Sequence, residues 1–344
     1  MSITVALDAM GGDLAPQATV AGAIRAAEAG HEVALVGDEA VLAEELAKHE
    51  IVPSGVRIVH APDVIDMHEQ PSLATARRRG SSIYVGLELL KNGEAGAFVS
   101  NGNTGAVLAL SLLVIGKLPG VDRPALAALI PPRTAGPTLL LDVGANAESR
   151  PLQLVQWGAI GAEYMKVAFG VANPKVGLLN IGEEPSKGSP LVVEANKALS
   201  QIPINFIGNI EGGDIARREI DVIVTDGFTG NVVLKLIEGM ATAILGSVRD
   251  AASGSMRARL GGLLLMPAVR DIRQRFDYRQ YGGAPLIGVN GMVLVGHGRS
   301  DVVAVGNAIA TAATAAELGA LDAFAAALER SGVSLGESSE EGSR

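Results

Sequence analysis

Short, continuously apolar runs alternate with longer helical stretches rich in Ala and Leu along most of this chain. Two of the runs, Leu139-Leu140-Leu141 and Val222-Ile223-Val224, contain no polar residue, as is typical of strands buried on both faces. Such strands occur mainly in parallel sheets covered by helices, so the pattern predicts an α/β fold. The expected strands lie near 3–8, 32–37, 56–60, 96–100, 125–130, 138–142, 175–181, 204–207, 221–225 and 290–295, and the expected helices near 16–30, 39–49, 72–92, 103–117, 151–170, 189–201, 230–250 and 301–330.

The alternation continues to about residue 250 without a Pro- or Ser-rich linker, so no domain boundary is indicated. A chain of 344 residues that is 48% hydrophobic is large enough to bury a core without disulfides or a structural metal. We expect one domain over 1–332, with a basic and apolar helical segment at 251–280. The Gly-, Ser- and Glu-rich tail at 333–344 is expected to be disordered.

The composition excludes several kinds of chemistry and partner. There is no cysteine, which excludes thiolate metal sites and a cysteine nucleophile. The net charge of −9 argues against a broad nucleic-acid surface. The first residues lack the basic and apolar regions of a secretory signal. We expect a cytoplasmic protein that does not span a membrane and does not bind nucleic acid.

Five loops combine Gly with Asn, Asp, Ser or Thr, each directly after a predicted strand. They are Asp8–Asp13, Ser100–Gly105, Asp142–Asn146, Asn180–Gly188 and Thr225–Asn231. Ligands of α/β sheets bind at such strand ends, and the helix N-termini that follow favour anions such as phosphate. The same polar residues are also common helix caps. Five such loops, on what we expect to be one edge of the sheet, favour a binding site over capping alone.

Two common catalytic motifs are absent, namely G-x-x-x-x-G-K-[ST] and H-E-x-x-H. His297 lies between two glycines in a loop, where functional residues are frequent. Lys187 follows a buried strand in a loop with Pro, Ser and Gly, and is a candidate phosphate ligand. A solvated loop lysine is the alternative. Lys235 lies four residues after Asn231, on the helix that the fifth loop begins.

Arginine is concentrated in two segments. Seven Arg and three Asp lie between Arg249 and Arg279, around an apolar stretch. Such a segment is expected to contact an anionic membrane or an acidic protein, or to pack as a helical hairpin at a subunit interface. The candidate contacts are Arg257, Arg259, Arg270, Arg273 and Arg275. Arg77–Arg79 form a second basic group, for which a solvated helix face is the alternative.

In this order, the loops resemble those of the PlsX family of bacterial phosphate acyltransferases. The matching segments are Leu7–Asp13, Ser100–Ala106, Arg123–Leu126, Leu141–Asn146, Asn180–Glu184 with Lys187-Gly188, Asp226–Asn231 and Tyr281–Leu286. The resemblance runs from residue 3 to about 325. It departs at Asn101, where the family pattern more often has a small residue.

The resemblance implies acyl transfer from a long-chain acyl-[acyl carrier protein] to inorganic phosphate. The acyl phosphate would feed phospholipid synthesis through a membrane acyltransferase similar to PlsY. It also implies a three-layer α/β/α fold with a mixed, largely parallel sheet and two intertwined subdomains, similar to isocitrate and isopropylmalate dehydrogenases. A homodimer, peripheral association with the inner face of the cell membrane and the absence of a cofactor are implied as well.

Phosphate is itself the nucleophile in that reaction, so the site needs positioning and fixed donors rather than a nucleophilic side chain. The expected catalytic residues are Lys187, Asn231 and Asp8. The expected substrate- and phosphate-binding residues are Gly11, Gly12, Asp13, Asn103, Thr104, Gly105, Asn146, Thr229 and His297, and no metal ligand is expected. An acidic carrier protein needs a local positive face on a chain of net charge −9, for which the two arginine segments are candidates.

Three alternatives stay open at this point. One is a phosphotransacetylase that uses coenzyme A thioesters. Another is a metal-dependent decarboxylating dehydrogenase, since one fold hosts many activities. The third is a peripheral membrane scaffold in which the segment of Arg and Leu carries the whole function.

Overall fold

Neighbouring residues of the central strands pack into different hydrophobic cores. In β6 (Thr138–Leu141), Leu139 and Leu141 belong to one core and Leu140 to another. In β9 (Val222–Val224), Ile223 is separated from its two neighbours in the same way. Successive side chains of a strand point to opposite faces, so both faces of the sheet are buried and the α/β prediction is confirmed.

The computed structural model describes residues 3–333 apart from 70–77, 131–135, 218, 254, 256, 260, 263, 268–277 and 281. The other strands are β1 (Thr4–Asp8), β2 (Glu32–Gly37), β3 (Val56–His60), β4 (Ala97–Ser100), β5 (Ala125–Ile130), β7 (Lys175–Asn180), β8 (Asn205–Glu211), β10 (Ala284–Ile287) and β11 (Met292–Val295). The helices are α1 (Gln17–Glu28), α2 (Glu39–Leu46), α4 (Ser82–Lys91), α5 (Thr104–Val114), α6 (Pro151–Phe169), α7 (Pro190–Leu199), α8 (Gly227–Ser253), α10 (Val302–Glu317) and α11 (Ala320–Ser331), with short 3-10 helices η1 (Asp214–Ala216) and η2 (Tyr278–Gln280).

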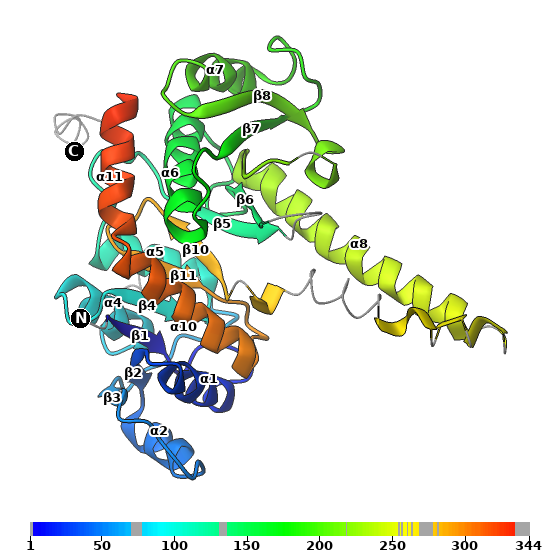
Figure 1. The fold of residues 1–344 in the computed structure, drawn as a ribbon. Coiled ribbons are helices and arrows are strands. Elements are labelled where there is room, and N and C mark those ends of the chain that lie inside the picture. The colour runs from blue at the N-terminus through cyan, green and yellow to red at the C-terminus, as the bar shows by residue number, and fades with distance from the viewer. Residues whose placement is uncertain are drawn as a thin grey trace.

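The strands of the described residues form one sheet, in the order β3-β2-β1-β4-β11-β10-β5-β6-β9-β7-β8. β1, β2, β3, β4 and β11 run parallel to one another, and so do β6, β7, β8 and β9. Antiparallel pairs join β11 to β10, β10 to β5 and β5 to β6. β10 and β11 come late in the chain yet lie between β4 and β5 (Figure 1). We call β1–β4 and β11 with their helices the first half of the molecule, and β5–β9 with their helices the second half; β10 joins the two. The strand directions confirm the expected mixed, largely parallel sheet.

Helices cover both faces of the sheet, which gives three layers (Figure 1). One core contains buried residues of α1, α2, α6, α7, α10 and α11. The opposite face is covered by α4 and α5 in the first half and by the start of α8 in the second half. The layers are those that the family resemblance implies.

Several expected element boundaries are corrected. The helix expected over 72–92 begins at Ser82, because the Ser81 side chain accepts the N–H of Tyr84 and caps it; residues 70–77 lie outside the described residues. The helix expected over 301–330 is two helices, with Gly319 at a φ of +69° between them. β10 is missing from the predicted strands because it contains Pro285, a residue that is rare inside sheets.

The direction of the strands overturns the expectation that the five polar loops share one edge. Three antiparallel pairings separate β11 from β6, so the loops after β1 and β4 follow strands opposite in direction to those before the other three loops. A twist of about 20–25° per strand accumulates over the four steps from β4 to β6 to about 80–100°. The two groups of strand ends therefore lie roughly at right angles. Figure 1 shows the beginnings of α8 and α10 on the same side of the molecule, above and below the junction of the halves.

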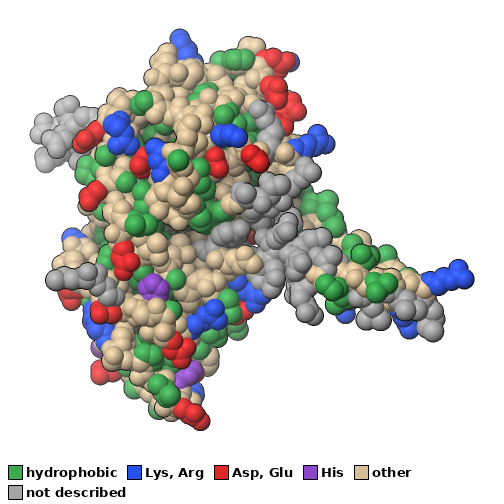
Figure 2. All heavy atoms as spheres, in the orientation of Figure 1, with side chains coloured by type: hydrophobic (Ala, Val, Ile, Leu, Met, Phe, Trp, Pro, Cys, Tyr) green, Lys and Arg blue, Asp and Glu red, His purple; other side chains and the backbone are tan. Residues whose placement is uncertain are grey.

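α8 leaves the body of the molecule as a long arm (Figure 1). Its first turns pack on the sheet through Val233, Leu234 and Ile237. Six large apolar side chains repeat along α8 at four-residue intervals and are exposed: Phe228, Val232, Leu236, Met240, Ile244 and Val248. Figure 2 shows hydrophobic side chains along the arm. By length and composition α8 is apolar enough to cross a membrane, as is the bent pair α10 and α11, most of whose apolar residues lie in the core.

Candidate functional site

Asp8, the last residue of β1, lies beneath the first group of loops. Its buried carboxylate accepts a hydrogen bond of 2.6 Å from Oγ of Ser100, the last residue of β4. The same Oγ accepts the N–H of Gly102 at 3.0 Å. Burial raises the pKa of Asp8, and hydrogen bonds led by that of Ser100 oppose the rise. A Cβ on Gly11 would overlap the carboxylate, so Asp8 holds the two loops tightly together.

The turn after β11 closes over the loop after β1. The N–H of Asp13 donates to the carbonyl oxygen of Gly298 at 2.7 Å, and a Cβ on Gly12 would lie 3.1 Å from that oxygen. His297 and Asp13 are both exposed at this rim, and His297 Nδ1 accepts the N–H of Arg299 at 3.2 Å. The structure thus brings the predicted residues of the first loop close to His297. We call residues 8–13, 100–105 and 296–300 the first loop cluster.

Asn103 caps α5 and also holds a neighbouring loop. Its Oδ1 accepts an N–H of the first turn at 3.1 Å, and its Nδ2 donates to the carbonyls of Met67 and Glu69 at 3.1 and 2.7 Å. Both amide protons are therefore used within the protein. Thr104 and Gly105 lie in the first turn of α5, where N–H groups lack intrahelical acceptors. These N–H groups, rather than the Asn103 side chain, are the ones available to an anion.

Asp142, directly after β6, organises the second group of loops. It is buried, and its carboxylate accepts five hydrogen bonds of 2.8–3.1 Å, from the N–H groups of Leu126, Gly144, Ala145 and Asn146 and from Nδ2 of Asn146. Burial raises the pKa of Asp142, and these donors oppose the rise. Asn146 Nδ2 also donates to the Pro124 carbonyl at 2.8 Å. Both amide protons of Asn146 are used in this way, so we assign Asn146 to holding the loop rather than to donating to phosphate.

The start of α8 packs directly on the loop that Asp142 holds. A Cβ on Gly230 would overlap the Asp142 carbonyl oxygen, so only glycine fits there. Asp226 caps the helix by accepting the N–H of Thr229 at 2.9 Å and its Oγ1–H at 2.7 Å. The hydroxyl proton of Thr229 is therefore engaged in the cap. Asn231 follows and is exposed, and its Nδ2 lies 3.5 Å from where a Cβ of Gly144 would be.

Lys187 lies in the loop after β7, which pairs in parallel with β9. Its loop therefore ends at the same edge of the sheet as the loop before α8. The Lys187 side chain is exposed, and its carbonyl accepts Nδ2–H of Asn180 at 2.9 Å, which closes the loop. We call residues 142–146, 180–188 and 225–231 the second loop cluster. The predicted site residues thus divide between two clusters, one on each half of the molecule.

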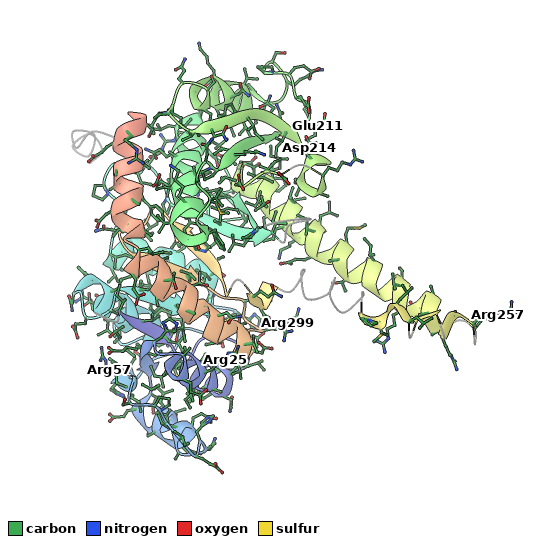
Figure 3. All side chains as sticks on the ribbon, in the orientation of Figure 1. Arg25, Arg57, Glu211, Asp214, Arg257 and Arg299 are labelled. Atoms are coloured by element: carbon green, nitrogen blue, oxygen red, sulfur yellow. The ribbon has the colours of Figure 1, made fainter. Side chains whose placement is uncertain are left out.

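The arginines of the predicted partner surface lie in different places. Arg257 and Arg259 are exposed beyond α8, and Figure 3 shows Arg257 at the far end of the arm. Arg77, Arg270, Arg273 and Arg275 lie outside the described residues. Arg78 donates to Glu69 Oε2 and to the Val64 carbonyl, both at 2.9 Å, and so holds a loop of the body.

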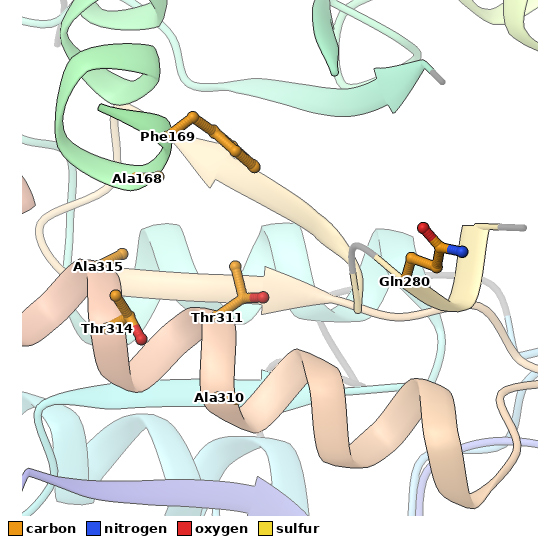
Figure 4. Close-up of a pocket in the computed structure, with 7 residues that line it drawn as sticks. All are labelled: Ala168, Phe169, Gln280, Ala310, Thr311, Thr314 and Ala315. Carbon is orange, nitrogen blue, oxygen red and sulfur yellow. The ribbon is translucent and has the colours of Figure 1, made fainter. Parts of the chain in front are cut away.

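A shallow cavity of about 210 Å³ lies between α6, α10 and η2 (Figure 4). It is lined by Ala168, Phe169, Gln280, Ala310, Thr311, Thr314 and Ala315. This lining contains no charged group and no residue of either loop cluster, so we do not place the chemistry there. Among the residues that the structure describes, no three His, Asp or Glu side chains come together in a way that fits a metal ion.

Sequence reasoning missed the residues that hold each cluster together. Ser100 and Asp142 were part of the polar loops, but the sequence does not show that Ser100 reaches Asp8 or that Asp142 takes five donors. One sequence feature could have identified both residues: each is polar, stands directly at the end of a buried strand and precedes a glycine by two positions. Asn101 lies in a predicted loop but was given no role, and Ser300 was not predicted; both are buried.

Comparison with known proteins places the chain in a family. A family model described as "Fatty acid synthesis protein" matches residues 3–322. The chain is similar to the protein named Phosphate acyltransferase of Myxococcus xanthus (strain DK1622), with 48% identity over 318 residues that cover 91% of this chain and 90% of that protein. It is similar to the one of Anaeromyxobacter sp. (strain K), with 46% identity over 325 residues that cover 94% and 90%.

Solved structures share the fold at low sequence identity. A phosphotransacetylase from Streptococcus pyogenes has a TM-score of 0.64 and 19% identity, covering 92% of this chain and 94% of that one. A 4-hydroxythreonine-4-phosphate dehydrogenase from Klebsiella pneumoniae has a TM-score of 0.54 and 13% identity, covering 91% and 100%. They confirm a fold that phosphotransacetylases and dehydrogenases share. Because the family model covers almost the whole chain and relatives approach half identity over nine-tenths of it, the chain belongs to the PlsX family of phosphate acyltransferases, as its loop motifs predict.

Proposed function

We propose that this protein transfers a long-chain acyl group from acyl carrier protein to inorganic phosphate. The observation that carries the proposal, beside family membership, is the start of α8. There Gly230 packs on the Asp142 carbonyl, and the amide of Asn231 lies next to Gly144. An exposed amide donor thus lies beside the N-terminus of a helix, an arrangement suited to phosphate and to a developing oxyanion.

The reaction needs no nucleophilic side chain. An oxygen of hydrogen phosphate attacks the thioester carbonyl, a C–O bond forms, and the C–S bond of the tetrahedral intermediate breaks. The proton of the phosphate hydroxyl passes to the leaving sulfur, so the products are acyl phosphate and the free thiol. The protein contributes by holding the two reactants together and by stabilising the oxyanion.

In this proposal each loop cluster holds one reactant. The second cluster supplies Lys187 and Asn231 to phosphate and the oxyanion, and Thr229 and Asn146 fix the loops that carry them. The first cluster, organised by Asp8, receives the acyl donor, with the first turn of α5 at Thr104 and Gly105 as a further anion site. The proposal requires both clusters to face the junction of the halves, where the strand ends lie roughly at right angles.

The partners follow from charge and exposed apolar surface. An acidic carrier protein requires positive charge near the site, and Figure 3 shows Arg299 and Arg25 on the first half, on the side from which the arm projects. The exposed apolar residues of α8 are suited to a second copy of the chain, because a contiguous apolar stripe marks an interaction surface.

The basic end of the arm at Arg257 and Arg259 is suited to anionic lipid. A cytoplasmic homodimer on the inner face of the membrane would then pass its acyl phosphate to a membrane acyltransferase.

The test is to incubate the purified protein with palmitoyl-carrier protein and phosphate and to detect palmitoyl phosphate by mass. Lys187→Ala and Asn231→Ala are expected to lower kcat/KM by about 10²–10³, the usual loss for one oxyanion donor. Lys197→Ala, which removes an exposed lysine of α7, is the matched control and retains activity. Turnover of acetyl coenzyme A without turnover of palmitoyl-carrier protein would identify a short-chain phosphotransacetylase instead.

A further inference from the structure

Two buried polar side chains of the first loop cluster have no hydrogen-bond partner. Asn101 is 2% exposed and Ser300 is 4% exposed. Within the described structure neither Oδ1 nor Nδ2 of Asn101, nor Oγ of Ser300, makes a hydrogen bond. Buried polar groups are normally satisfied, and an unsatisfied amide disfavours the folded state. The amide of Asn101 therefore requires an explanation.

Both side chains border the same glycine. A Cβ on Gly296 would overlap Asn101 Oδ1 and would lie 3.4 Å from Ser300 Oγ. On the other side, a Cβ on Gly12 would lie 3.2 Å from the Asn101 Cβ. The amide is thus enclosed between the loop after β1 and the turn after β11. Backbone hydrogen bonds from Asp13 to Gly298 and from Gly296 to Ser100 tie this turn down, so the turn must lift before a ligand reaches the amide.

We propose that Asn101, together with Ser300, binds an amide group of the pantetheine arm of the acyl donor when the turn at 296–300 lifts. The inference rests on the proposed function, which supplies the thioester donor. Asparagine presents an N–H donor and a carbonyl acceptor side by side, which complements both polar atoms of a secondary amide. The Ser300 hydroxyl takes either role. The carboxylate of Asp13 lies next to Gly298 of this turn and disfavours an anion at the Asn101 amide, so a neutral amide fits there better than phosphate.

This proposal makes Asn101 a specificity residue whose removal has opposite effects on stability and on binding. Asn101→Ala deletes the unsatisfied amide, so the Tm of the free protein stays equal to that of wild type or rises. The same variant loses the rise in Tm that free pantetheine produces in wild type. In palmitoyl phosphate formation, its inhibition constant for pantetheine increases about tenfold, while its KM for phosphate stays unchanged. Ser300→Ala is expected to show the same pattern with a smaller change. If Asn101→Ala does not fold, Asn101→Ser is measured in its place.

Tyr164→Phe is the matched control. It also removes a buried hydroxyl without a partner, but from α6 in the core of the second half, and pantetheine binding stays as in wild type. The proposal is overturned if Asn101→Ala binds pantetheine as wild type does, or if its KM for phosphate increases instead. Failure of wild type to form any acyl phosphate would overturn the proposed function, whereas failure of Asn101→Ala to alter pantetheine binding in an active enzyme would overturn this inference alone.

Discussion

Ser100 and Asp8, 92 residues apart in the chain, are joined by a hydrogen bond of 2.6 Å inside the protein. The bond connects the ends of β4 and β1 and fixes the two loops that leave those strands. The second half has its counterpart in Asp142, whose carboxylate gathers the backbone of its own loop and the N–H of Leu126 on β5. Each half of the molecule thus uses a buried aspartate at a strand end to hold a loop cluster in place.

Asp8 makes stability depend on pH. Its pKa is raised by burial, so between the unfolded value near 3.8 and the folded value the folded state holds a proton that the unfolded state has lost. The free energy of unfolding therefore falls as pH rises through this window. Asp8→Asn is expected to flatten that fall. Ser100→Ala removes a hydrogen bond that lowers the pKa of Asp8. We therefore expect the fall in stability to continue to higher pH in this variant. Urea denaturation at several pH values from 4 to 7 measures both, and parallel curves for all three proteins would contradict the assignment.

Asp142→Ala is expected to lower the free energy of unfolding by at least about 3 kcal/mol, because several buried N–H groups lose their acceptor at once and each unsatisfied group costs about 1–3 kcal/mol. Asp142→Asn keeps one acceptor oxygen and is expected to lose less. Equilibrium unfolding in urea gives the order of the three proteins. A loss below about 1 kcal/mol for Asp142→Ala would mean that water replaces the carboxylate.

Substitutions at two glycines of α8 distinguish the effect of close packing on stability from the effect of helix propensity. Gly230→Ala places a methyl group on the Asp142 carbonyl oxygen, so we expect a loss of about 1–3 kcal/mol in stability from overpacking and reduced activity, since Asn231 shifts. Gly239→Ala has nothing within 4 Å of the added Cβ and is expected to gain about 0.5–1 kcal/mol. Thermal unfolding measures the stability of the two variants, and the formation of palmitoyl phosphate measures their activity. Equal effects at both positions would show that the contact with Asp142 is not tight.

Asp301 caps α10 through the N–H groups of Val303 and Ala304 and pairs with Arg279 at 2.8 Å. Burial alone would raise the pKa of Asp301, but the cap and the guanidinium outweigh it and lower the pKa. The stability that this carboxylate provides is therefore present above pH 3.8 and is lost as pH falls through the folded pKa.

Asp301→Ala loses the cap and is expected to destabilise by about 1 kcal/mol. Asp301→Asn keeps the cap and loses only an exposed ion pair, for which about 0–1 kcal/mol is typical. Tm values at pH 7 and pH 3 distinguish the two contributions. The difference between wild type and Asp301→Asn should shrink at the lower pH, and a constant difference would contradict the role of the charge.

The arm offers separate tests of dimerisation and of lipid contact. Leu236→Glu places a charge in the middle of the exposed apolar face of α8, where Leu236 is 61% exposed, and is expected to convert a dimer into a monomer, as measured by sedimentation. Arg257→Glu with Arg259→Glu is expected to leave the dimer intact and to weaken sedimentation with vesicles that contain anionic lipid. If the first variant stays dimeric, the apolar face of α8 is not the interface.

Local patterns in the sequence were sufficient to predict the three layers of the fold and the polar loops that follow its strands. Runs such as Leu139–Leu141 require burial on both faces, and the order of the Gly- and Asn-containing loops predicts the family. Boundaries were less certain where one residue decides them, as with the cap at Ser81 and the positive φ of Gly319. These depend on local backbone conformation, which composition and periodicity describe poorly.

The amino-acid sequence by itself determined the α/β class, the family and the set of residues from which a site is built, because burial, helix capping and turn chemistry are local and leave a pattern in the chain. Only the tertiary structure decided that these residues form two clusters, since the direction of a strand depends on pairings such as β5 with β6 that join distant segments. It also decided which polar groups are already used within the protein, as in Asn103 and Asn146, and which, like the amide of Asn101, are buried without a partner. Hydrogen-bond satisfaction is a property of neighbours in space, and the linear order of residues does not contain it.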